Sequence, residues 1–390
     1  MILENYSSDA NRARVLLFSH RNIYEHEVWR CSFHEFEKVL RTIEDVDVLA
    51  PEPRSWYPHG KRVALRLGER FRTPVNPGIP RIDVDKDYDI FFAVCEKPSE
   101  LLHINAVKDW KRRCRTSFCL VTEYYAHLIP ETQSCMEVLS QFDHVLFMFD
   151  TSAPFQERIG GRGSYFPAGI DAIRFCPYPN PPRRSIDVMS IGRKSEETHQ
   201  ALLKLSRDKG LFYVYDTIDD LHAYNLDEHR SLIANMAKRS RYFMVNPGKI
   251  DSPEETGGQS EFGYRYFEGA APGALMIGER PSNREFERIF HWPDAVFRVP
   301  FGSQDVGAIL DDLDQQPERQ ARARKRNMVE CLRHHDWLHR WEAVLDRAGL
   351  APLAAAQERK QRLDELAAMV EEQPLDSIEE LSAQNRICKS

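Results

Sequence analysis

Three features of the sequence predict an α/β protein with two domains, each built on a parallel sheet. Short apolar runs of strand length alternate with segments whose apolar residues recur at helical spacing, which is the pattern of parallel strands joined by helices. Acidic residues precede several of these runs, as in DVDVLA, DYDIFFAV and SIDVMSIG, which fits a chain leaving a helix and entering a strand buried on both faces. The alternation stops at a proline-rich segment and then restarts, which predicts a second sheet.

The first domain is predicted from five strands and the helices between them. A strand at residues 14–19 is followed by a helix at 27–43, and further helices are expected at 100–112 and 132–142. The other strands of this half are expected at residues 46–49, 90–94, 117–121 and 145–149. Residues 51–80 break this rhythm, because they are rich in proline, arginine and aromatic side chains. We interpret them as a long excursion over the sheet that could carry acceptor contacts.

Four of the six residues 177–182 are proline, which predicts the interdomain linker there. Beyond it we expect strands at 186–191, 211–215, 242–245 and 274–277, with helices at 196–209, 226–239 and 261–271. The last third is expected to be helical at 306–313, 317–334 and 336–348, then to continue from about residue 351 as a solvated helix and a frayed end. The predicted domains are residues 1–175, residues 176–335, and a C-terminal helix and tail at residues 336–390.

Composition limits the classes of function. The chain has 390 residues, of which 42% are hydrophobic and 29% charged, and its formal net charge is −7. This charge argues against a general nucleic-acid binder and leaves local basic patches possible. No apolar run approaches the roughly 18 residues of a membrane span, and the N-terminus has no apolar core of signal-peptide length, so we expect a cytoplasmic protein with at most peripheral membrane contact. The eight cysteines form no CxxC pair, so we expect neither a zinc site nor a disulfide framework.

The stretch of residues 261–279 is the first candidate for chemistry. Glu261, Arg265 and Glu268 are expected near a helix start, where outward-pointing N–H groups favour anions such as phosphate. The amides of the preceding run, residues 256–260, could form an anion nest. The Glu268 carboxylate could accept hydrogen bonds from two neighbouring hydroxyls, such as a ribose diol. The alternatives are a solvated amphipathic helix, or a buried ion pair between Arg265 and Glu268 on one helix face.

A second candidate is the turn formed by Gly192, Arg193 and Lys194, at the carboxyl end of the second domain's first strand. Open α/β sheets bind ligands at this edge. Arginine offers a planar fork to phosphate oxygens, and lysine offers a compact charge that could stabilise a leaving phosphate. A basic turn that is merely solvated is the alternative.

The first domain offers candidates for the acceptor side. His20 follows the first strand and could act as an acid, a base or an acceptor-orienting group. Glu123 also follows a strand, although polar residues there often only cap it. Two metal motifs are weaker. The DxD-like acids at residues 83–87 precede a strand rather than follow it, and His335 and His339 have no third ligand near them in sequence, so a structural helix explains that pair better.

Four pieces of the second half carry a family resemblance: FPAGIDAIRF, SIDVMSIGR, GYRYFEGAAPGALMIGE and HHDWLHRWEAVL. Their order and spacing resemble group 1 glycosyltransferases of the GT-B fold, and most of all the CgeB-like branch, over residues 165–345. The resemblance implies two Rossmann-like domains facing a central cleft, with C-terminal helices crossing back. It also implies that the first domain holds the acceptor and the second domain holds a nucleotide-sugar donor.

The same resemblance implies roles for residues of the second domain. The Gly-Arg turn of such enzymes lies near the donor diphosphate, and the glutamate of the FE pair lies on the nucleotide ribose; these positions are Gly192, Arg193 and Glu268. Many group 1 enzymes carry two glutamates eight positions apart. Here Glu261 and Glu268 are seven apart, so Ser260 occupies the strictly spaced position.

Together these features predict a hexosyltransferase-type enzyme that moves a sugar from a nucleotide-sugar donor to a glycan or small-molecule hydroxyl acceptor. The resemblance suggests retention of anomeric configuration, and we expect no metal or other cofactor and no nucleic-acid partner. The candidate catalytic residues are His20, Glu123, Lys194 and Glu261. The candidate donor-binding residues are Gly192, Arg193, Ser260, Arg265 and Glu268. A nucleotide-sugar epimerase of the same fold, or a non-catalytic binding or scaffold protein, remain as alternatives.

Overall fold

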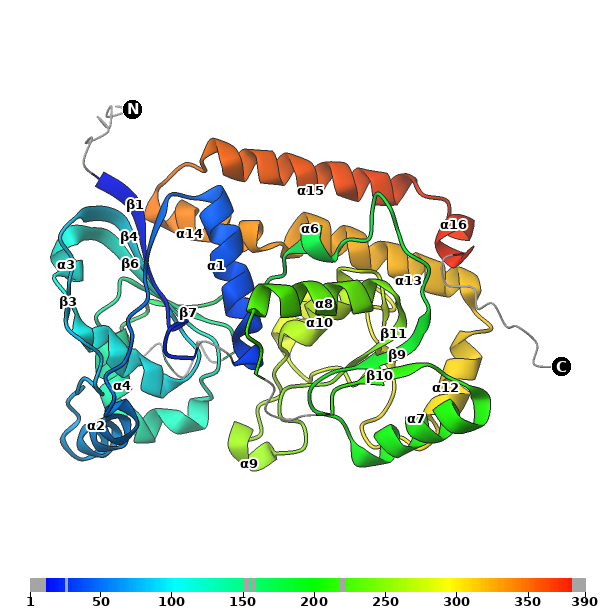
Figure 1. The fold of residues 1–390 in the computed structure, drawn as a ribbon, viewed down its shortest axis with the longest axis horizontal. Coiled ribbons are helices and arrows are strands. Elements are labelled where there is room, and N and C mark those ends of the chain that lie inside the picture. The colour runs from blue at the N-terminus through cyan, green and yellow to red at the C-terminus, as the bar shows by residue number, and fades with distance from the viewer. Residues whose placement is uncertain (1–11, 25–26, 151–154, 156–158, 218–221, 381–390) are drawn as a thin grey trace. The chain divides into compact units, whose positions relative to one another are not determined.

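The computed structural model describes residues 12–24, 27–150, 155, 159–217 and 222–380 (Figure 1). The chain divides into two compact units, each with its own parallel sheet. Unit 1 comprises Met1–Glu25, Leu40–Pro167 and Glu342–Leu353, and unit 2 comprises His26–Val39, Ala168–Trp341 and Ala354–Ser390. The C-terminal part therefore returns to unit 1 before the chain ends in unit 2. The predicted domain boundaries at residues 175 and 335 stay a prediction.

The sheet of unit 1 has six parallel strands in the order β2-β1-β4-β6-β7-β8. Their bounds are β1 (Arg12–Phe18), β2 (Val46–Leu49), β4 (Asp87–Cys95), β6 (Cys114–Val121), β7 (His144–Phe147) and β8 (Gly163–Tyr165). The register places Val15 opposite Val46 on one side and Ile90 on the other. The five predicted strands are confirmed, and the short strand β8 is additional. A separate pair joins β3 (Ile82–Asp83) to β5 (Val107–Lys108).

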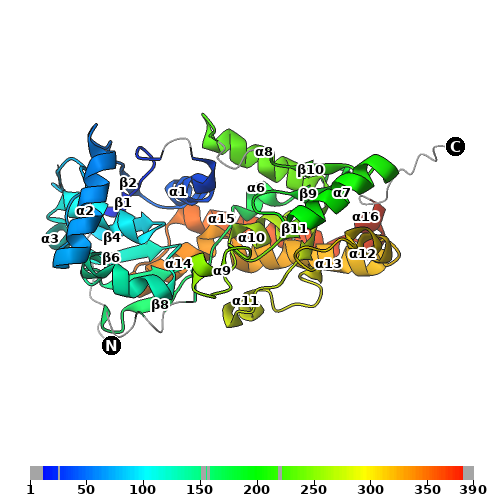
Figure 2. The same ribbon diagram turned by 90° about the horizontal axis from the view of Figure 1, so that it is seen from below.

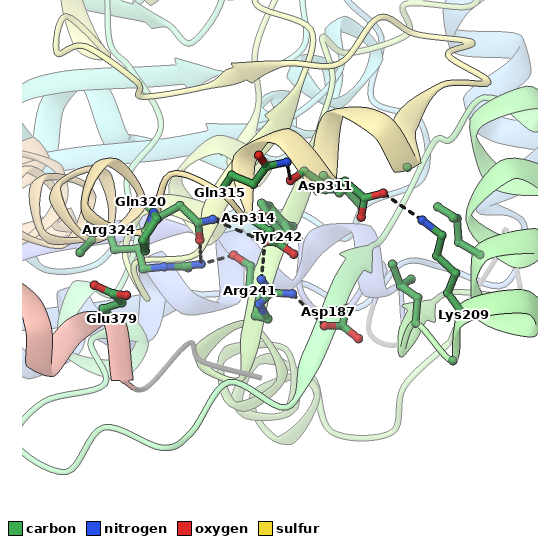
Figure 3. A pocket seen from close by; sticks show the side chains of 17 residues that line it. Asp187, Lys209, Arg241, Tyr242, Asp311, Asp314, Gln315, Gln320, Arg324 and Glu379 are labelled. Carbon is green, nitrogen blue, oxygen red and sulfur yellow. Dashed lines mark hydrogen bonds and ion pairs between the residues drawn. The ribbon is translucent and has the colours of Figure 1, made fainter. Parts of the chain in front are cut away.

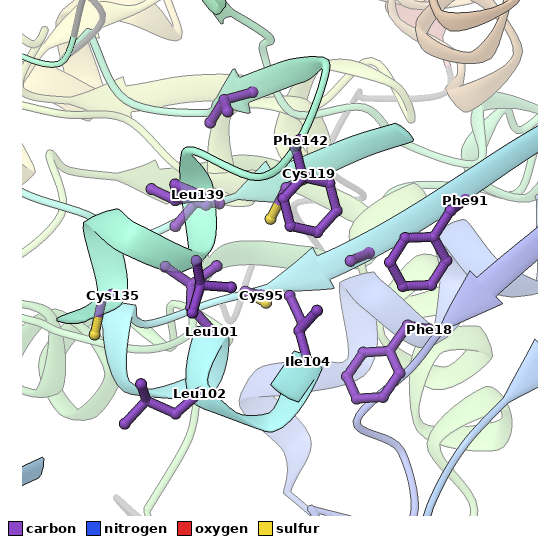
Figure 4. Packing of buried hydrophobic residues seen from close by; sticks show 14 of the residues in the cluster. Phe18, Phe91, Cys95, Leu101, Leu102, Ile104, Cys119, Cys135, Leu139 and Phe142 are labelled. Carbon is purple, nitrogen blue, oxygen red and sulfur yellow. The ribbon is translucent and has the colours of Figure 1, made fainter. Parts of the chain in front are cut away.

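Helical segments and aromatic side chains complete unit 1. The helical segments up to residue 139 are η1 (Val28–Arg30), α1 (Cys31–Ile43), α2 (Tyr57–Phe71), η2 (Pro98–Ala106), α3 (Trp110–Arg113), η3 (Ala126–Glu131) and α4 (Gln133–Leu139). Of these, η1 and the first nine residues of α1 are assigned to unit 2. In the core of unit 1 (Figure 4), Phe91 of β4 stacks on Trp110 and Phe142, with ring centroids 4.7 and 5.9 Å apart. Burial on both faces explains why these strands read as continuous apolar runs.

Residues 51–80, interpreted as a long excursion over the sheet, contain the helix α2, which was not predicted there. Pro58 lies in the first turn of the helix, where its missing N–H removes no helical hydrogen bond. Gly68 lets α2 approach α4 closely, because a Cβ at this position would lie 2.4 Å from Ser134 Oγ. Neither Pro58 nor Gly68 therefore disrupts this helix.

The sheet of unit 2 has five parallel strands in the order β10-β9-β11-β12-β13. Their bounds are β9 (Ile186–Ser190), β10 (Tyr213–Tyr215), β11 (Ser240–Val245), β12 (Leu275–Gly278) and β13 (Phe297–Arg298). The chain runs from β9 to β10 on one side and then to β11 on the other. The strand order therefore reverses between β9 and β11, and the carboxyl edge at such a reversal is where open α/β sheets bind ligands.

The helices of unit 2 before residue 331 are α6 (Ala172–Phe175), α7 (Glu196–Lys209), α8 (Leu226–Lys238), α9 (Pro253–Thr256), α10 (Tyr264–Ala270), α11 (Arg284–Ile289), α12 (Val306–Leu313) and α13 (Pro317–Glu330). A π-helical turn, η4 (Cys331–His335), leads into α14 (Trp337–Ala348), α15 (Ala354–Glu372) and α16 (Leu375–Glu380). Trp337 and Trp341 are each 1% exposed, so they pack α14 onto the protein. None of the helices in the described ranges combines the length and apolar character needed to cross a membrane.

The helix α15 differs from its prediction in one respect. It was expected to be solvated, but Leu363, Leu366 and Val370 are each buried to 1% exposure or less. These side chains recur three and four residues apart, so one face of the helix packs onto the protein. The expected frayed end falls partly on residues 381–390, which lie outside the described residues.

Candidate functional site

The turn between β9 and α7 lies at the carboxyl edge of the unit 2 sheet, as predicted. Gly192 has a φ of 84°, a left-handed conformation that glycine adopts without steric cost. Asp216, which follows the neighbouring strand β10, accepts the Gly192 N–H through Oδ2 at 2.7 Å. Its Oδ1 also accepts a hydrogen bond from the Lys194 ammonium at 3.1 Å. One carboxylate therefore fixes both the shape of the turn and the position of its lysine.

Arg265 of α10 lies against this turn. A Cβ at Gly192 would be 3.6 Å from Arg265 Nε, so the glycine leaves space beside the guanidinium. Arg265 donates to Glu268 Oε2, and its side chain is 38% exposed whereas that of Glu268 is 1% exposed. This is the ion pair that the sequence left open as the alternative for these two residues. Solvent reaches Arg265 beside the turn and does not reach its carboxylate partner.

Arg265 is the exposed end of a row of four charged side chains of unit 2, which we call the ion chain: Glu35, Arg230, Glu268 and Arg265. Arg230 of α8, 1% exposed, donates to Glu268 Oε1 and, through Nε, to Glu35 Oε2 at 2.6 Å. Glu35 of α1 also accepts the backbone N–H of Asp171 at 2.9 Å. The charges alternate along the row, so each buried ion has a partner of opposite sign.

The pKa values of the two carboxylates of the ion chain are shifted in opposite directions. Burial alone would raise the pKa of Glu268, but the charges of Arg265 and Arg230 outweigh it and lower this pKa to about 2. Burial raises the pKa of Glu35, which has one arginine partner and lies near the Asp171 carboxylate. Glu268 therefore remains ionised at neutral pH and holds Arg265 in place.

Arg193 and Lys194 add two further cations around Gly192. Arg193 is 45% exposed and donates to Asp251 Oδ1 at 2.7 Å and to Ser252 Oγ at 3.0 Å. The Lys194 side chain is 25% exposed. With Arg265, the edge of the sheet carries three partly exposed cations, and each has a carboxylate partner of its own.

Glu261 and Ser260 precede α10 rather than lying within it, because the helix is shorter than the predicted 261–271. Glu261 is 3% exposed, and its carboxylate accepts from Gln259 Nε2 at 3.1 Å and from Asn283 Nδ2 at 2.8 Å. Ser260 Oγ accepts a backbone N–H of the loop before α11 at 3.3 Å. These bonds connect the loops before α10 and α11. A role of either residue in catalysis or donor binding stays a prediction.

His20 and Glu123 belong to unit 1, where both lie at the carboxyl edge of the sheet. His20 is 3% exposed, with Nδ1 2.9 Å from Val94 O and 3.8 Å from Glu100 Oε2. The backbone N–H of Glu123 donates to Glu96 O at 2.8 Å. Their positions match the expected strand ends, and their action on an acceptor stays a prediction.

His335 and His339, the weak zinc candidates, make the contacts of structural side chains. Arg340 donates to His335 Nδ1 at 3.2 Å, and the His335 ring packs edge-on against Phe267 with centroids 5.4 Å apart. His339 Nε2 lies 3.2 Å from Leu332 O. These contacts agree with the structural interpretation of the pair.

A cavity of about 1130 Å³ lies at the opposite, amino edge of the same sheet (Figure 3). Ion pairs cross its wall: Arg241 pairs with Asp187 at 3.1 Å, and Lys209 pairs with Asp311 at 2.9 Å. The recess beside the β9 turn is far smaller, at about 10 Å³. Parallel α/β sheets bind their ligands at the carboxyl edge. We therefore take the β9 turn, and not the amino-edge cavity, as the candidate site.

Comparisons with known proteins agree with this architecture. Residues 214–346 match the family model of glycosyl transferase-like domains. The match begins in β10 and includes α10, so it covers Asp216, Arg230, Arg265 and Glu268. No curated protein matches the chain.

Solved structures show a shared fold. An alpha-glucosyltransferase in complex with UDP and a 13-mer DNA is 11% identical to this chain, with a TM-score of 0.50 over 86% of this chain and 99% of that chain. The protein HepE of Anabaena, solved with UDP-glucose, is 9% identical with a TM-score of 0.49, over 86% and 99% of the two chains. The chain has the GT-B fold of two Rossmann-like units. The DNA belongs to the other enzyme, and the absence of a nucleic-acid partner stays a prediction here.

Several residues of the site were missed by sequence reasoning. Asp216 was passed over because a single acid after a strand carries no motif. Glu35 and Arg230 contact each other across 195 residues of sequence, which no local pattern reveals. His229, beside Arg230 on α8, has its pKa lowered by burial and by the charges of Arg265 and Arg230. The sequence contained one signal for these residues: Asp216 directly follows a predicted strand, and ligands bind at the carboxyl ends of such strands.

Proposed function

We propose that this protein is a nucleotide-sugar-dependent glycosyltransferase whose unit 2 binds the donor diphosphate between the Gly192 turn and Arg265. The observation that carries the proposal is the meeting of this left-handed glycine with an arginine from α10, at the carboxyl edge where the strand order reverses. Arg193 and Lys194 flank the same point. The match of residues 214–346 to glycosyl transferase-like domains supports it.

The proposed reaction is transfer of the sugar to a hydroxyl group. The acceptor oxygen bonds to the anomeric carbon, the bond from that carbon to the diphosphate breaks, and the hydroxyl proton passes to a base. Negative charge grows on the diphosphate as it leaves, and fixed cations stabilise that charge. Arg193, Lys194 and Arg265 would supply the charge that a metal ion supplies in other enzymes, which is why we propose a metal-independent reaction.

The remaining roles follow from the placement of the side chains. Glu268 acts through Arg265 as a positioning residue, and contact with the donor ribose would require it to exchange one of its arginine partners. His20 and Glu123 of unit 1 are the proposed acceptor-side groups, and either could act as the base. Retention of anomeric configuration is proposed on the resemblance to group 1 enzymes.

A screen of nucleotide sugars tests this function. A donor present at 100 times its dissociation constant should stabilise the protein by about 2.7 kcal/mol, and incubation with hydroxyl acceptors should give a glycosylated product by mass spectrometry. The anomeric proton coupling in the NMR spectrum of that product reports retention or inversion. An isomerised donor without acceptor would point to an epimerase, and binding without turnover would point to a non-catalytic protein. Absence of stabilisation by every nucleotide sugar would refute the site.

A further inference from the structure

We propose that the exposed face of α2, with its flanking arginines, binds the surface of an anionic lipid membrane. This surface belongs to unit 1 and is independent of the proposed donor site. The helix has 15 residues, a length of about 22 Å, and lies at the periphery of unit 1 in both views (Figure 1, Figure 2). We infer its occupant from three features: an apolar stripe, a row of arginines beside it, and the lack of carboxylate partners for those arginines among the residues that the structure describes.

The apolar stripe is formed by Trp56, Val63, Leu67 and Phe71, which are 48%, 53%, 38% and 62% exposed. These are half of the eight large hydrophobic side chains exposed in the described part of the chain. Their spacing of seven, four and four residues places them on one side of the helix. The opposite border of the stripe is the buried face of the helix, which includes Ala64 and Gly68. The stripe therefore continues the apolar surface of α2 from its buried face to its solvent-exposed side.

Trp56 is fixed in its exposed position by the backbone around it. A Cβ at Gly60 would lie 2.4 Å from the Trp56 ring, and one at Gly78 would lie 2.9 Å from it. The indole of Trp56 therefore packs against the backbone at these two glycines and exposes its other side to solvent. Tryptophan is enriched where proteins meet the headgroup level of a membrane, because its ring is apolar and its N–H is polar.

Arginines border the stripe on its other side. On a helix of 3.6 residues per turn, Arg62, Arg66 and Arg70 follow one another along the edge next to the apolar side chains. The segment 54–72 contains six lysines and arginines against the single acid Glu69, in a chain whose net charge is −7. A basic border beside an apolar face with tryptophan and phenylalanine is the arrangement of helices that lie in the membrane interface.

Among the described residues, no carboxylate pairs with Arg54, Arg62, Arg66, Arg70 or Arg72. Several exposed arginines of unit 2 do form ion pairs: Arg319 with Asp294, Arg322 with Glu318 and Arg333 with Glu371. The charge beside α2 is therefore available to an external partner.

The chemistry of this surface favours a membrane over other partners. Nucleic acid would satisfy the arginines and leave Val63, Leu67 and Phe71 in water. A second copy of the chain would cover the apolar stripe but would bring two rows of arginines toward each other. Anionic lipid satisfies both, because phosphate headgroups meet the arginines while the apolar side chains enter the boundary of the acyl chains.

Flotation of the full chain with vesicles tests the proposal. We expect binding to vesicles of mixed phosphatidylglycerol and phosphatidylcholine and little binding to phosphatidylcholine alone. The variant Arg62→Glu/Arg66→Glu should bind the mixed vesicles at least about 30-fold more weakly, the effect of losing two basic side chains at a membrane surface. The matched control Lys204→Glu/Arg207→Glu makes the same charge change on exposed positions of α7 and should bind like the wild type.

A second measurement reports insertion of the apolar stripe. Brominated lipids should quench the fluorescence of Trp56, and Trp56→Phe should remove that quenching while leaving the circular dichroism spectrum unchanged. Leu67→Ser/Phe71→Ser should weaken vesicle binding, whereas Leu232→Ser, at an exposed leucine of α8, should not. Equal vesicle binding by the wild type and the arginine variant would overturn the proposal. So would binding of duplex DNA, lost in the same variant, by a protein that does not bind vesicles.

Discussion

Replacement of Glu268 by glutamine tests the ion chain directly. The glutamine has nearly the same shape, so the change removes one buried negative charge between two arginines and leaves little cavity. Removing one partner of a buried ion pair costs about 3–5 kcal/mol, because the other charge stays buried without compensation. Two features of the structure place this variant at the lower end of that range. Arg230 keeps Glu35 as a partner, and Arg265 is 38% exposed and can be solvated.

We therefore expect Glu268→Gln to lower the free energy of unfolding by about 3 kcal/mol at neutral pH. For a domain of roughly 150–250 residues, this corresponds to a fall in Tm of about 6–12 °C. Thermal unfolding followed by circular dichroism measures the shift. The matched control is Glu318→Gln on α13, since Glu318 is 69% exposed and pairs with the exposed Arg322. Surface pairs of this kind contribute at most about 1 kcal/mol, so the control should change little.

The pH dependence gives the same prediction a second, independent test. The pKa of Glu268 in the folded protein is about 2, below its ordinary value of 4.5, so the unfolded chain takes up the proton first as the pH falls. The stabilisation from Glu268 is complete above pH 4.5 and is lost as the pH approaches 2. The difference in stability between wild type and Glu268→Gln should shrink over this window. A variant that unfolds like the wild type at neutral pH would refute this account of the ion chain.

Two further predictions concern single residues of unit 2. Gly192→Ala should weaken nucleoside diphosphate binding, because the new methyl group would occupy the space between the turn and Arg265 in which we propose that the diphosphate binds, and because the φ of 84° disfavours alanine. The control is Gly210→Ala, which has a φ of 70° and no atom within 4 Å of the new Cβ, so it carries the backbone strain alone. The buried His335 has its pKa lowered well below 6.5 by burial and by the Arg340 charge, so unfolding free energy should fall as the pH drops below 6.5, and His335→Phe should flatten that slope in acid denaturation curves.

The strands of this protein were readable from sequence because most of them are buried on both faces. Ile90 and Phe91 of β4 are fully buried, as are Val188 and Met189 of β9, so apolar runs of strand length marked them without ambiguity. The helix α2 was not readable for the opposite reason. Trp56, Leu67 and Phe71 lie on its exposed face, where a solvated helix would carry polar residues, so its apolar positions do not mark the buried face alone.

The candidate site likewise has a part that the sequence predicted and a part that it did not. The Gly192 turn was predicted because strand, glycine, cations and helix follow one another within a few residues. The ion chain was not predicted beyond Arg265 and Glu268, because Glu35 joins it from another part of the sequence. Sequence reasoning assigned Glu268 to the donor from its expected place near a helix start and from the family resemblance. The position of its two oxygens, each accepting from an arginine, depends on how α1, α8 and α10 pack, which local patterns do not encode.

The most direct test of the central claim compares a nucleoside diphosphate with its nucleoside. Calorimetric titration with UDP, GDP and TDP should identify a ligand that binds the wild type at least about 30-fold more tightly than the matching nucleoside, since charge-assisted bonds to the diphosphate contribute about 2 kcal/mol or more. In Arg265→Gln this advantage should largely disappear, while the affinity for the nucleoside stays the same. A nucleoside diphosphate that binds Arg265→Gln as tightly as the wild type would contradict the account.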